Sequence, residues 1–542
     1  MKFCLPLLLA LSLFSCMKGK SVDLVVHNAR IHTMNDENSI EEAMAIKDGK
    51  IVEVGPERQI LNKYSADEYI DAGKKDVFPG LTDSHGHMMS YARQLLSVDL
   101  VGCKSFNELV VRVEKYSQAH PSGFIIGRGW DQSLWGTDVL PTNERLNELF
   151  PNIPVLLHRI DGHAALVNQK ALDLAGITPE TKVDGGSISL NAEGKCTGLL
   201  LDNAIELVSK RFPDFPKKDL VASLQNVQGE LLQYGITGVH EAGVEQKDYQ
   251  LLKRMVDQNK LHLDLYVMLY PTEENIAFAR KSGKIKHKNL IVRSFKVMGD
   301  GALGSHGALL KQPYTDDVHS HGLLTTSPED LQRIALIAES IGYQVNIHAI
   351  GDSTNRLVLD LLVQIRERNA DHRWRIEHAQ VIDPKDFELF ATTGAFPSVQ
   401  PTHAVSDQRW AQQRLGSDRL KGAYAYKTLL NQTGMLALGT DFPVELTNPY
   451  LTIQAAVNRT NADGDPIGGF LPEEALTEDE CLRGMTIWPA YASFQESRIG
   501  TLEKGKEATF VILAFPFRIR TEFESNYAFK VFIRGRERYS SE

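Results

Sequence analysis

The chain has 542 residues, 42% hydrophobic and 24% charged, and its 59 Lys and Arg against 69 Asp and Glu give a net charge of −10. These ordinary values exclude a disordered, collagen-like or disulfide-scaffold protein. Because the chain is acidic and has no basic stripe, we expect no nucleic-acid partner. The length allows three or four domains, or fewer if one is an α/β barrel.

The first residues have the pattern of an export signal. Lys2 precedes an apolar run ending at Ser15, which is too short to span a bilayer core of about 30 Å but typical of a secretory signal. Leu13-Phe-Ser-Cys16 resembles a bacterial lipobox, in which the cysteine is lipidated; ordinary cleavage and a retained anchor are the alternatives. We therefore predict an exported protein of the bacterial cell envelope, periplasmic or at the surface, held to the membrane only by a lipid anchor at Cys16.

Short strands are predicted near both ends of the mature chain. Residues 44–55 have the pattern of a hairpin with Asp48-Gly49 at its turn. Similar strands recur at 508–514 and 529–534. Two β-rich ends around a longer middle predict one small β-sandwich domain formed by both termini.

In the middle of the chain, short apolar runs alternate with amphipathic stretches of helical length. Eight such runs begin at residues 77, 235, 263, 294, 344, 374, 395 and 435. Eight strand–helix alternations are typical of a (β/α)8 TIM barrel, an α/β fold. The gap at 105–230 is too long for one helix and predicts a subdomain inserted over the barrel mouth after the first barrel strand. The predicted parts are a signal peptide (1–15), the first part of the β domain (16–76), the barrel (77–495) with its insertion (105–230), and the second part of the β domain (496–542).

Histidines and an acid end several of the predicted barrel strands, where barrel enzymes build their active sites. His85 and His87 follow the first run, and residues i and i+2 of an extended strand point to one face, so both imidazoles can reach one ion. An isolated pair of this kind also fits two surface histidines, so the argument depends on the other strands. These carry Lys296, His348, His378 and Asp441. The remaining cysteines are scattered without Cys-x-x-Cys spacing, so metal ligands are expected among His and carboxylates.

This pattern resembles the amidohydrolase superfamily of metal-dependent hydrolases, and more narrowly its amidohydrolase-3 branch, which includes N-substituted formamide deformylases. The resemblance covers most of the chain, from the split β domain to the segment near residue 500. The narrower motifs are Gly129-Trp130-Asp131, Asp161-Gly162-His163, the segment 296–305 and Gly439-Thr-Asp441-Phe-Pro.

The resemblance implies a metal cofactor, with one or two ions per chain. Histidine and carboxylate ligands favour Zn²⁺, although imidazole also suits iron and manganese. His85 and His87 are implied ligands of the more buried metal, and His348 and His378 of the more exposed one. Lys296 lies where many relatives have a carboxylated lysine that bridges two metals, although an ordinary lysine is the alternative. Asp441 is implied to be both a metal ligand and the carrier of a proton from water to the leaving nitrogen.

The implied reaction is hydrolysis of a non-peptide carbon–nitrogen bond in a small-molecule substrate, by hydroxide on the metal. Deaminases of the superfamily usually have a Glu three residues after the histidine of the fifth strand, where this chain has Gly351. Amide hydrolysis therefore ranks above ring deamination. The alternatives are a deaminase or another hydrolase of the same superfamily, and a catalytically silent ligand-binding lipoprotein. Whether the chain forms a homo-oligomer is left open.

Five further side chains are candidate substrate contacts, each with a structural alternative. Trp130 and His163 lie in the insertion and can equally pack within that subdomain. His240 follows the second strand and can be a hydrogen-bonded core residue. Gln400 and His403 follow the seventh strand and can belong to a solvated loop.

Overall fold

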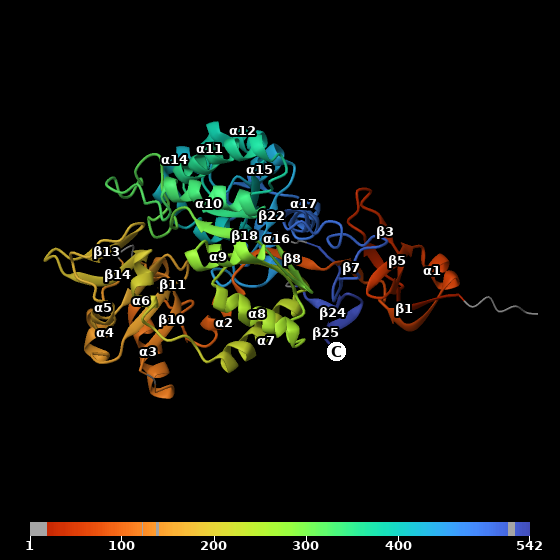
Figure 1. Ribbon diagram of the computed structural model, residues 1–542, viewed down its shortest axis with the longest axis horizontal. Helices are drawn as coiled ribbons and strands as arrows, with labels where there is room; N and C mark the ends of the chain where they lie inside the picture. Colours follow the sequence, from red (N-terminus) through yellow and green to blue (C-terminus); the bar gives the residue numbers. More distant parts are fainter. Residues whose placement is uncertain (1–18, 122, 137–139, 519–525) are drawn as a thin grey trace, which may run out of the picture.

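The computed structural model describes residues 19–121, 123–136, 140–518 and 526–542 (Figure 1). The predicted signal peptide and the lipidation site at Cys16 lie outside the described residues. In the part of the chain that is described, no helix is both long and apolar enough to cross a bilayer.

The centre of the molecule is a sheet of eight parallel strands that follow one another in sequence order. A short strand, β17 (Ile285–His287), pairs antiparallel with the fourth of them. The hydroxyl of Ser84 on the first strand donates to the carbonyl of Leu438 on the last, which nearly closes the sheet into a barrel. The predicted (β/α)8 TIM barrel is thus confirmed. Its strands are β8 (Leu81–Gly86), β15 (Ile236–Val244), β16 (Asp264–Leu269), β18 (Leu290–Met298), β19 (Gln344–Ala349), β20 (Arg375–His378), β21 (Phe396–Val399) and β22 (Ala437–Leu438).

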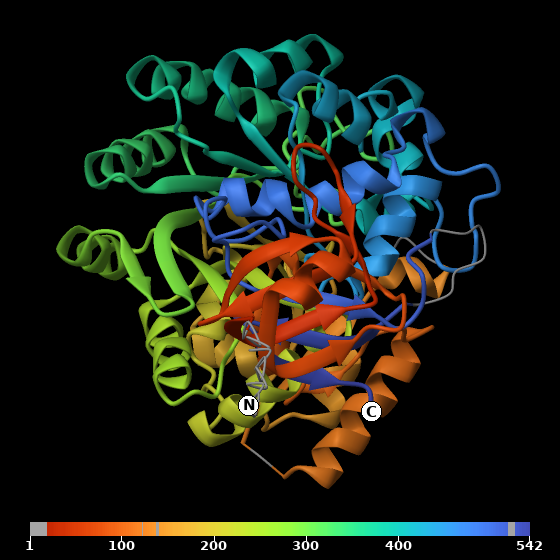
Figure 2. The same ribbon diagram turned by 90° about the vertical axis from the view of Figure 1, so that its right-hand side faces the viewer.

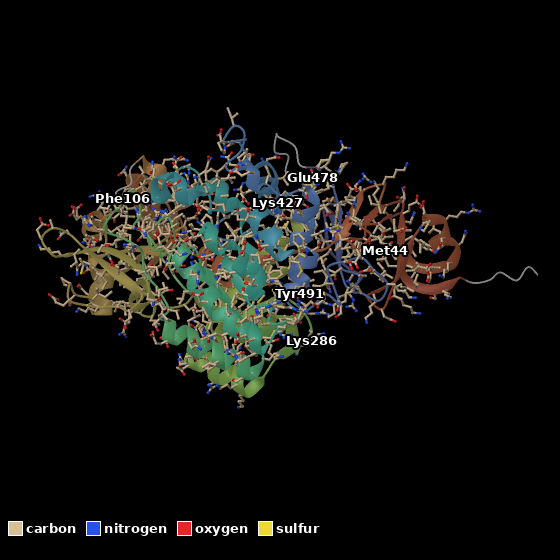
Figure 3. All side chains as sticks on the ribbon, turned by 90° about the horizontal axis from the view of Figure 1, so that it is seen from above. Met44, Phe106, Lys286, Lys427, Glu478 and Tyr491 are labelled. Carbon is tan, nitrogen blue, oxygen red and sulfur yellow. The ribbon has the colours of Figure 1, made fainter. Side chains whose placement is uncertain are left out.

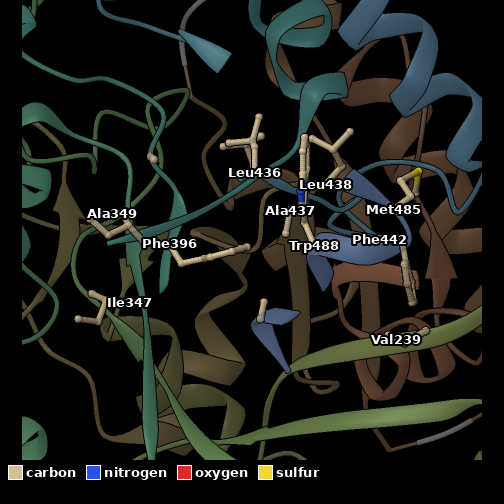
Figure 4. Packing of buried hydrophobic residues seen from close by; sticks show 14 of the residues in the cluster. Val239, Ile347, Ala349, Phe396, Leu436, Ala437, Leu438, Phe442, Met485 and Trp488 are labelled. Atoms are coloured by element: carbon tan, nitrogen blue, oxygen red, sulfur yellow. The ribbon is translucent and has the colours of Figure 1, made fainter. Parts of the chain in front are cut away.

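Helices follow each barrel strand and cover the outside of the sheet, which leaves both of its faces buried. Apolar side chains from around the barrel gather in its core, as Figure 4 shows for Val239, Ile347, Phe396 and Leu438. The helices are α2 (Met88–Gln94), α7 (Lys217–Gln233), α8 (Gln246–Asp257), α9 (Glu273–Ser282), α10 (Pro328–Ile341), α11 (Asp352–Arg368), α12 (Phe387–Thr393), α13 (Pro401–Asp407), α14 (Ala411–Leu420), α15 (Tyr426–Thr433), α16 (Pro449–Asn458), α17 (Glu478–Gly484) and α18 (Ile487–Ala492).

Helix α10 shows how the local sequence defines these elements. The side chain of Ser327 accepts a hydrogen bond from the backbone N–H of Asp330, and Pro328 occupies the first turn, where its missing N–H has no cost. Gly342 ends the helix in the left-handed conformation, with a φ of 67°. Between these ends, Leu331, Ile334, Ala335 and Ala338 form the buried face at helical spacing.

The segment between the first two barrel strands contains its own six-stranded sheet, in the order β13-β14-β12-β11-β10-β9. In Figure 1 it lies to the left of the barrel, and in Figure 3 its residue Phe106 and Met44 of the β domain mark opposite ends of the molecule. Its elements are β9 (Val98–Asp99), α3 (Phe106–Ala119), β10 (Ile125–Trp130), α4 (Glu144–Leu149), β11 (Val155–Arg159), β12 (Ala164–Val167), α5 (Gln169–Ala175), β13 (Gly186–Leu190), β14 (Cys196–Asp202) and α6 (Ala204–Ser209).

Strands from both ends of the chain share one sheet, as predicted. The six-stranded order is β25-β24-β23-β7-β2-β3. The red N-terminal and blue C-terminal strands lie together in Figure 2. A four-stranded sheet, β5-β4-β1-β6, contains the predicted hairpin. The elements are β1 (Lys20–His27), β2 (Arg30–His32), β3 (Ile40–Glu41), β4 (Ala43–Lys47), β5 (Lys50–Gly55), α1 (Glu57–Lys63), β6 (Tyr64–Asp71), β7 (Asp76–Pro79), β23 (Phe510–Leu513), β24 (Ala528–Ile533) and β25 (Arg536–Ser540). The residue boundaries assigned above to the domains stay a prediction.

Candidate metal centre

The carboxyl ends of the barrel strands open into a cavity of about 980 Å³, whose wall also includes residues of the insertion. All six candidate ligands line it, together with two of the candidate substrate contacts. These lining residues are His85, His87, His163, Lys296, His348, His378, His403 and Asp441.

One group of candidate ligands consists of His85, His87 and Asp441, whose ligand atoms lie within 4.8 Å of one another. The Nε2 atoms of His87 and His85 lie 3.0 Å and 3.6 Å from Oδ1 of Asp441. The backbone N–H of Asp441 donates to the carbonyl of His85 at 2.7 Å, which holds the first and last strand ends together. Lys296 Nζ lies 3.2 Å from His85 Nε2.

A second group shares Asp441 and adds His378 and His403, again within 4.8 Å. His403 Nε2 lies 3.6 Å from Asp441 Oδ2, and the rings of His378 and His403 are stacked with their centroids 5.8 Å apart. One carboxylate therefore faces two sets of imidazoles. This arrangement can hold one or two metal ions.

The backbone at this site is held in an unfavourable conformation. His378 has a φ of 71° and Asp441 a φ of 61°, in the left-handed region that side chains other than glycine rarely adopt. Such a conformation costs about 1–3 kcal/mol at each position and persists only where the surrounding structure maintains it. His378 ends β20 and Asp441 lies three residues after the end of β22, so the barrel supplies that support.

The donor set fits a metal. His378 Nδ1 and His403 Nε2 are buried without a hydrogen-bond partner in the described part of the chain. Orphaned buried nitrogens of this kind are rare in native proteins unless an ion or water satisfies them. Imidazole nitrogens and a carboxylate oxygen are ligands that Zn²⁺ accepts, although imidazole suits several other transition metals.

Burial also keeps these imidazoles in the form that binds a metal. It lowers the pKa of His85, His348 and His378 well below the ordinary value, so that they are neutral. For Asp441 burial acts in the opposite direction, but the surrounding histidines, His85 foremost, hold the pKa of this carboxyl below its usual range. Burial lowers the pKa of Lys296 to about 8.

A buried carboxylate orients His85. The Nδ1 atom of His85 lies 2.5 Å from Glu377 Oε2, and the other oxygen of Glu377 is 2.8 Å from the Nε of Arg375. Proton donation from Nδ1 leaves the lone pair of Nε2 free to face the cavity, the usual arrangement of a metal-binding histidine. The sequence analysis missed Glu377 and Arg375. The only sequence signal for these two residues was their position in a buried strand, and packing in the core explains that position equally well.

His348 does not join either group of ligand atoms. Its Nε2 lies 3.5 Å from the carbonyl oxygen of Gly301 and 3.6 Å from Oδ1 of Asp300, although its ring centroid is 4.5 Å from that of His378. His403, which the sequence suggested as a substrate contact, lies with His378 instead. The structure thus brings together His85, His87, His378 and Asp441, with Lys296 beside them.

Of the other candidate substrate contacts, His163 reaches the cavity and three do not. His163 Nδ1 is 2.7 Å from Asp202 Oδ1, and its ring lies 5.0 Å from that of His348. Trp130 is fully buried in the insertion and donates its indole N–H to Leu157. His240 is buried against Arg375, and Gln400 is buried with its amide on the carbonyl of Ser398.

Comparison with known proteins identifies the family from the sequence. A profile of the amidohydrolase family matches residues 68–537. The protein LONG AFTER FAR-RED 3 of Arabidopsis thaliana is 33% identical over 92% of this chain and 88% of its own. N-substituted formamide deformylase of Arthrobacter pascens is 28% identical over 91% of this chain and 93% of its own.

Among solved structures, an uncharacterized metal-dependent hydrolase from Pyrococcus horikoshii matches with a TM-score of 0.75 and 28% identity. The match covers 95% of this chain and all of that one. Because the family profile spans most of the chain and the structural match includes both the barrel and its additions, this protein belongs to the amidohydrolase family.

Proposed function

We propose that this hydrolase cleaves a non-peptide, amide-type carbon–nitrogen bond in a small molecule, with metal, preferably zinc, held by His85, His87, His378, His403 and Asp441. The observation that carries the proposal is the position of Asp441, whose carboxylate is shared by both groups of candidate ligands. A metal held by these residues would supply a water of lowered pKa and would polarise a carbonyl group.

The protein's own residues provide the proton transfer. Because its pKa is low, Asp441 is available as a base at neutral pH, and it lies where it can accept a proton and pass it to the leaving nitrogen. His163 faces the same cavity with Asp202 at its Nδ1, and although burial opposes protonation, this partner raises the pKa of His163. In our proposal His163 donates a hydrogen bond to the substrate carbonyl oxygen.

The surroundings of Gly351 favour amide hydrolysis over ring deamination. Gly351 has no side chain that could act as an acid, and its N–H donates to Asp300 at 2.8 Å. The next residue, Asp352, accepts a hydrogen bond from the backbone of Lys311 at 2.8 Å and is not among the residues that line the cavity. Export and lipid anchoring at Cys16 remain part of the proposal.

Replacement of Asp441 by Asn tests the mechanism. With metal content matched to the native protein, Asp441→Asn should lower kcat on N-formyl and N-acetyl amines by about 10²- to 10⁴-fold, the usual effect of losing a general base. Binding of the same amides should persist. Asp418→Asn, at an exposed carboxylate, is the control and should keep full activity. Turnover at the native rate by Asp441→Asn would rule out the proposed proton carrier.

A further inference from the structure

Arg128 is a cation in the cavity wall without a carboxylate partner. It lies on β10, and one of its terminal nitrogens donates to the carbonyl of Ile160 at 3.1 Å. The other terminal nitrogen is 3.5 Å from the hydroxyl of Ser90, and Nε is buried without a hydrogen-bond partner among the described residues. Most of the hydrogen-bonding capacity of this guanidinium is therefore unused.

The other arginines of the wall are all engaged. Arg93 pairs with Asp214 and Asp248 at 2.9 Å and 2.7 Å. Arg159 pairs with Asp131 and Asp161, and Arg409 lies 3.6 Å from Asp131. In the described part of the chain, Arg128 is thus the arginine of the cavity that has no acid within ion-pair distance.

The acids whose charge acts on Arg128 are Asp161 and Asp441, and both have partners of their own. Asp161 pairs with Arg159 and accepts the backbone N–H of His163 at 3.0 Å. Asp441 faces the imidazoles of the metal centre. A guanidinium stays protonated at any physiological pH. A half-buried one whose Nε has no partner and that has no carboxylate in contact is costly.

The position of Arg128 places this charge next to the metal centre. Ser90 lies on α2, which begins directly after His87. Ile160 precedes the turn that carries His163, and a Cβ on Gly162 in that turn would come within 3.2 Å of the guanidinium. The charge therefore lies between two segments that each present a histidine to the cavity.

We propose that Arg128 binds a carboxylate on the substrate, so that the preferred substrates are N-acyl compounds with a carboxylate close to the scissile bond. The planar guanidinium matches a carboxylate in two parallel hydrogen bonds. The amide part of this statement rests on the proposed function, whereas carboxylate binding does not. A phosphate offers similar oxygens, but its extra charge would meet the many acids of the wall.

Binding to metal-free protein tests the proposal without turnover. Calorimetry compares N-acetyl amino acids of graded size with their neutral primary amides, on the native protein, Arg128→Gln and Arg145→Gln. We expect each native carboxylate that binds to do so about 10- to 100-fold more tightly than its amide, the range for a charged hydrogen-bonded pair. Arg128→Gln should abolish this preference. Arg145→Gln, an exposed arginine of the same insertion, should keep it.

Each of several results would overturn the proposal: no carboxylate of the series binding the native protein, acids and amides binding equally, or Arg128→Gln retaining the preference. If Arg128 only supported the fold, its loss would weaken acid and amide binding alike. Inorganic phosphate displacing the acids with at least tenfold higher affinity would assign the site to phosphate instead. A retained carboxylate preference without hydrolysis by the zinc-loaded protein would contradict the proposed function but not the carboxylate site.

Discussion

His85 depends on Glu377 for its orientation, since the two side chains are fully buried and 2.5 Å apart. Glu377→Gln would remove the charge that holds the proton on Nδ1. Loss of such a partner typically weakens metal binding by about 10- to 100-fold, and we expect that change in the zinc dissociation constant, measured by competition with a chromophoric chelator. Glu388→Gln, on an exposed side chain of α12, is the control. Native affinity in Glu377→Gln would show that the carboxylate has no such role.

Lys296 should make the stability of the metal-free protein depend on pH. Burial lowers its pKa from 10.5 to about 8, so between these values the unfolded chain binds more protons than the folded one. Stability therefore rises with pH across this window and is reduced below it, by about 3 kcal/mol in all.

The measurement is the free energy of unfolding in urea at pH 7.5 and 10.5. The native protein should gain about 3 kcal/mol relative to Lys296→Met, with Lys421→Met at an exposed lysine as the control. If the free energy of unfolding changed equally between the two pH values in the native protein and in Lys296→Met, a buried amine of lowered pKa would be contradicted. The same lowered pKa provides the neutral amine that carboxylation requires.

Among the elements, the seam between β8 and β22 positions the shared ligand. Burial raises the pKa of Asp83 to about 7, and the carboxyl accepts hydrogen bonds from the hydroxyl and the backbone N–H of Thr440 at 2.7 Å and 3.1 Å. Because Thr440 precedes Asp441 and Asp83 lies two residues before His85, this contact helps to align the two strand ends.

Thr440→Val keeps the shape of the side chain and removes its hydroxyl. A buried acceptor that loses its partner costs about 1–3 kcal/mol, and urea unfolding should show a loss of that size. Thr392→Val, exposed on α12, should change stability by less than about 0.5 kcal/mol. If Thr440→Val were as stable as Thr392→Val, the hydrogen bond between Thr440 and Asp83 would not support the closure of the barrel.

For the whole molecule, the features that could be predicted from the sequence are those that depend on local periodicity. The eight strands could be recognised because each is a short apolar run between amphipathic helices, and His85 and His87 because a strand aligns residues two apart. The burial of Trp130 could not be predicted, since it depends on how the sheet of the insertion packs.

Contacts between elements that lie far apart in the chain could not be predicted from the sequence. His348 lies near the end of β19, whereas His403 lies in the first turn of α13, after β21. Only that turn places His403 beside Asp441. Nothing in the sequence distinguishes Arg128 from other charged residues. Its lack of a carboxylate partner depends on how α2 and the insertion enclose it.

Metal content is the most direct test of the central claim that two imidazole groups share Asp441. Elemental analysis of protein purified without chelator, before and after reconstitution with zinc, should give about two equivalents per chain. His403→Ala should retain about one, and His306→Ala, outside both groups, should retain the native content. One equivalent or none in the native protein, even after reconstitution, would contradict the claim that two groups share Asp441.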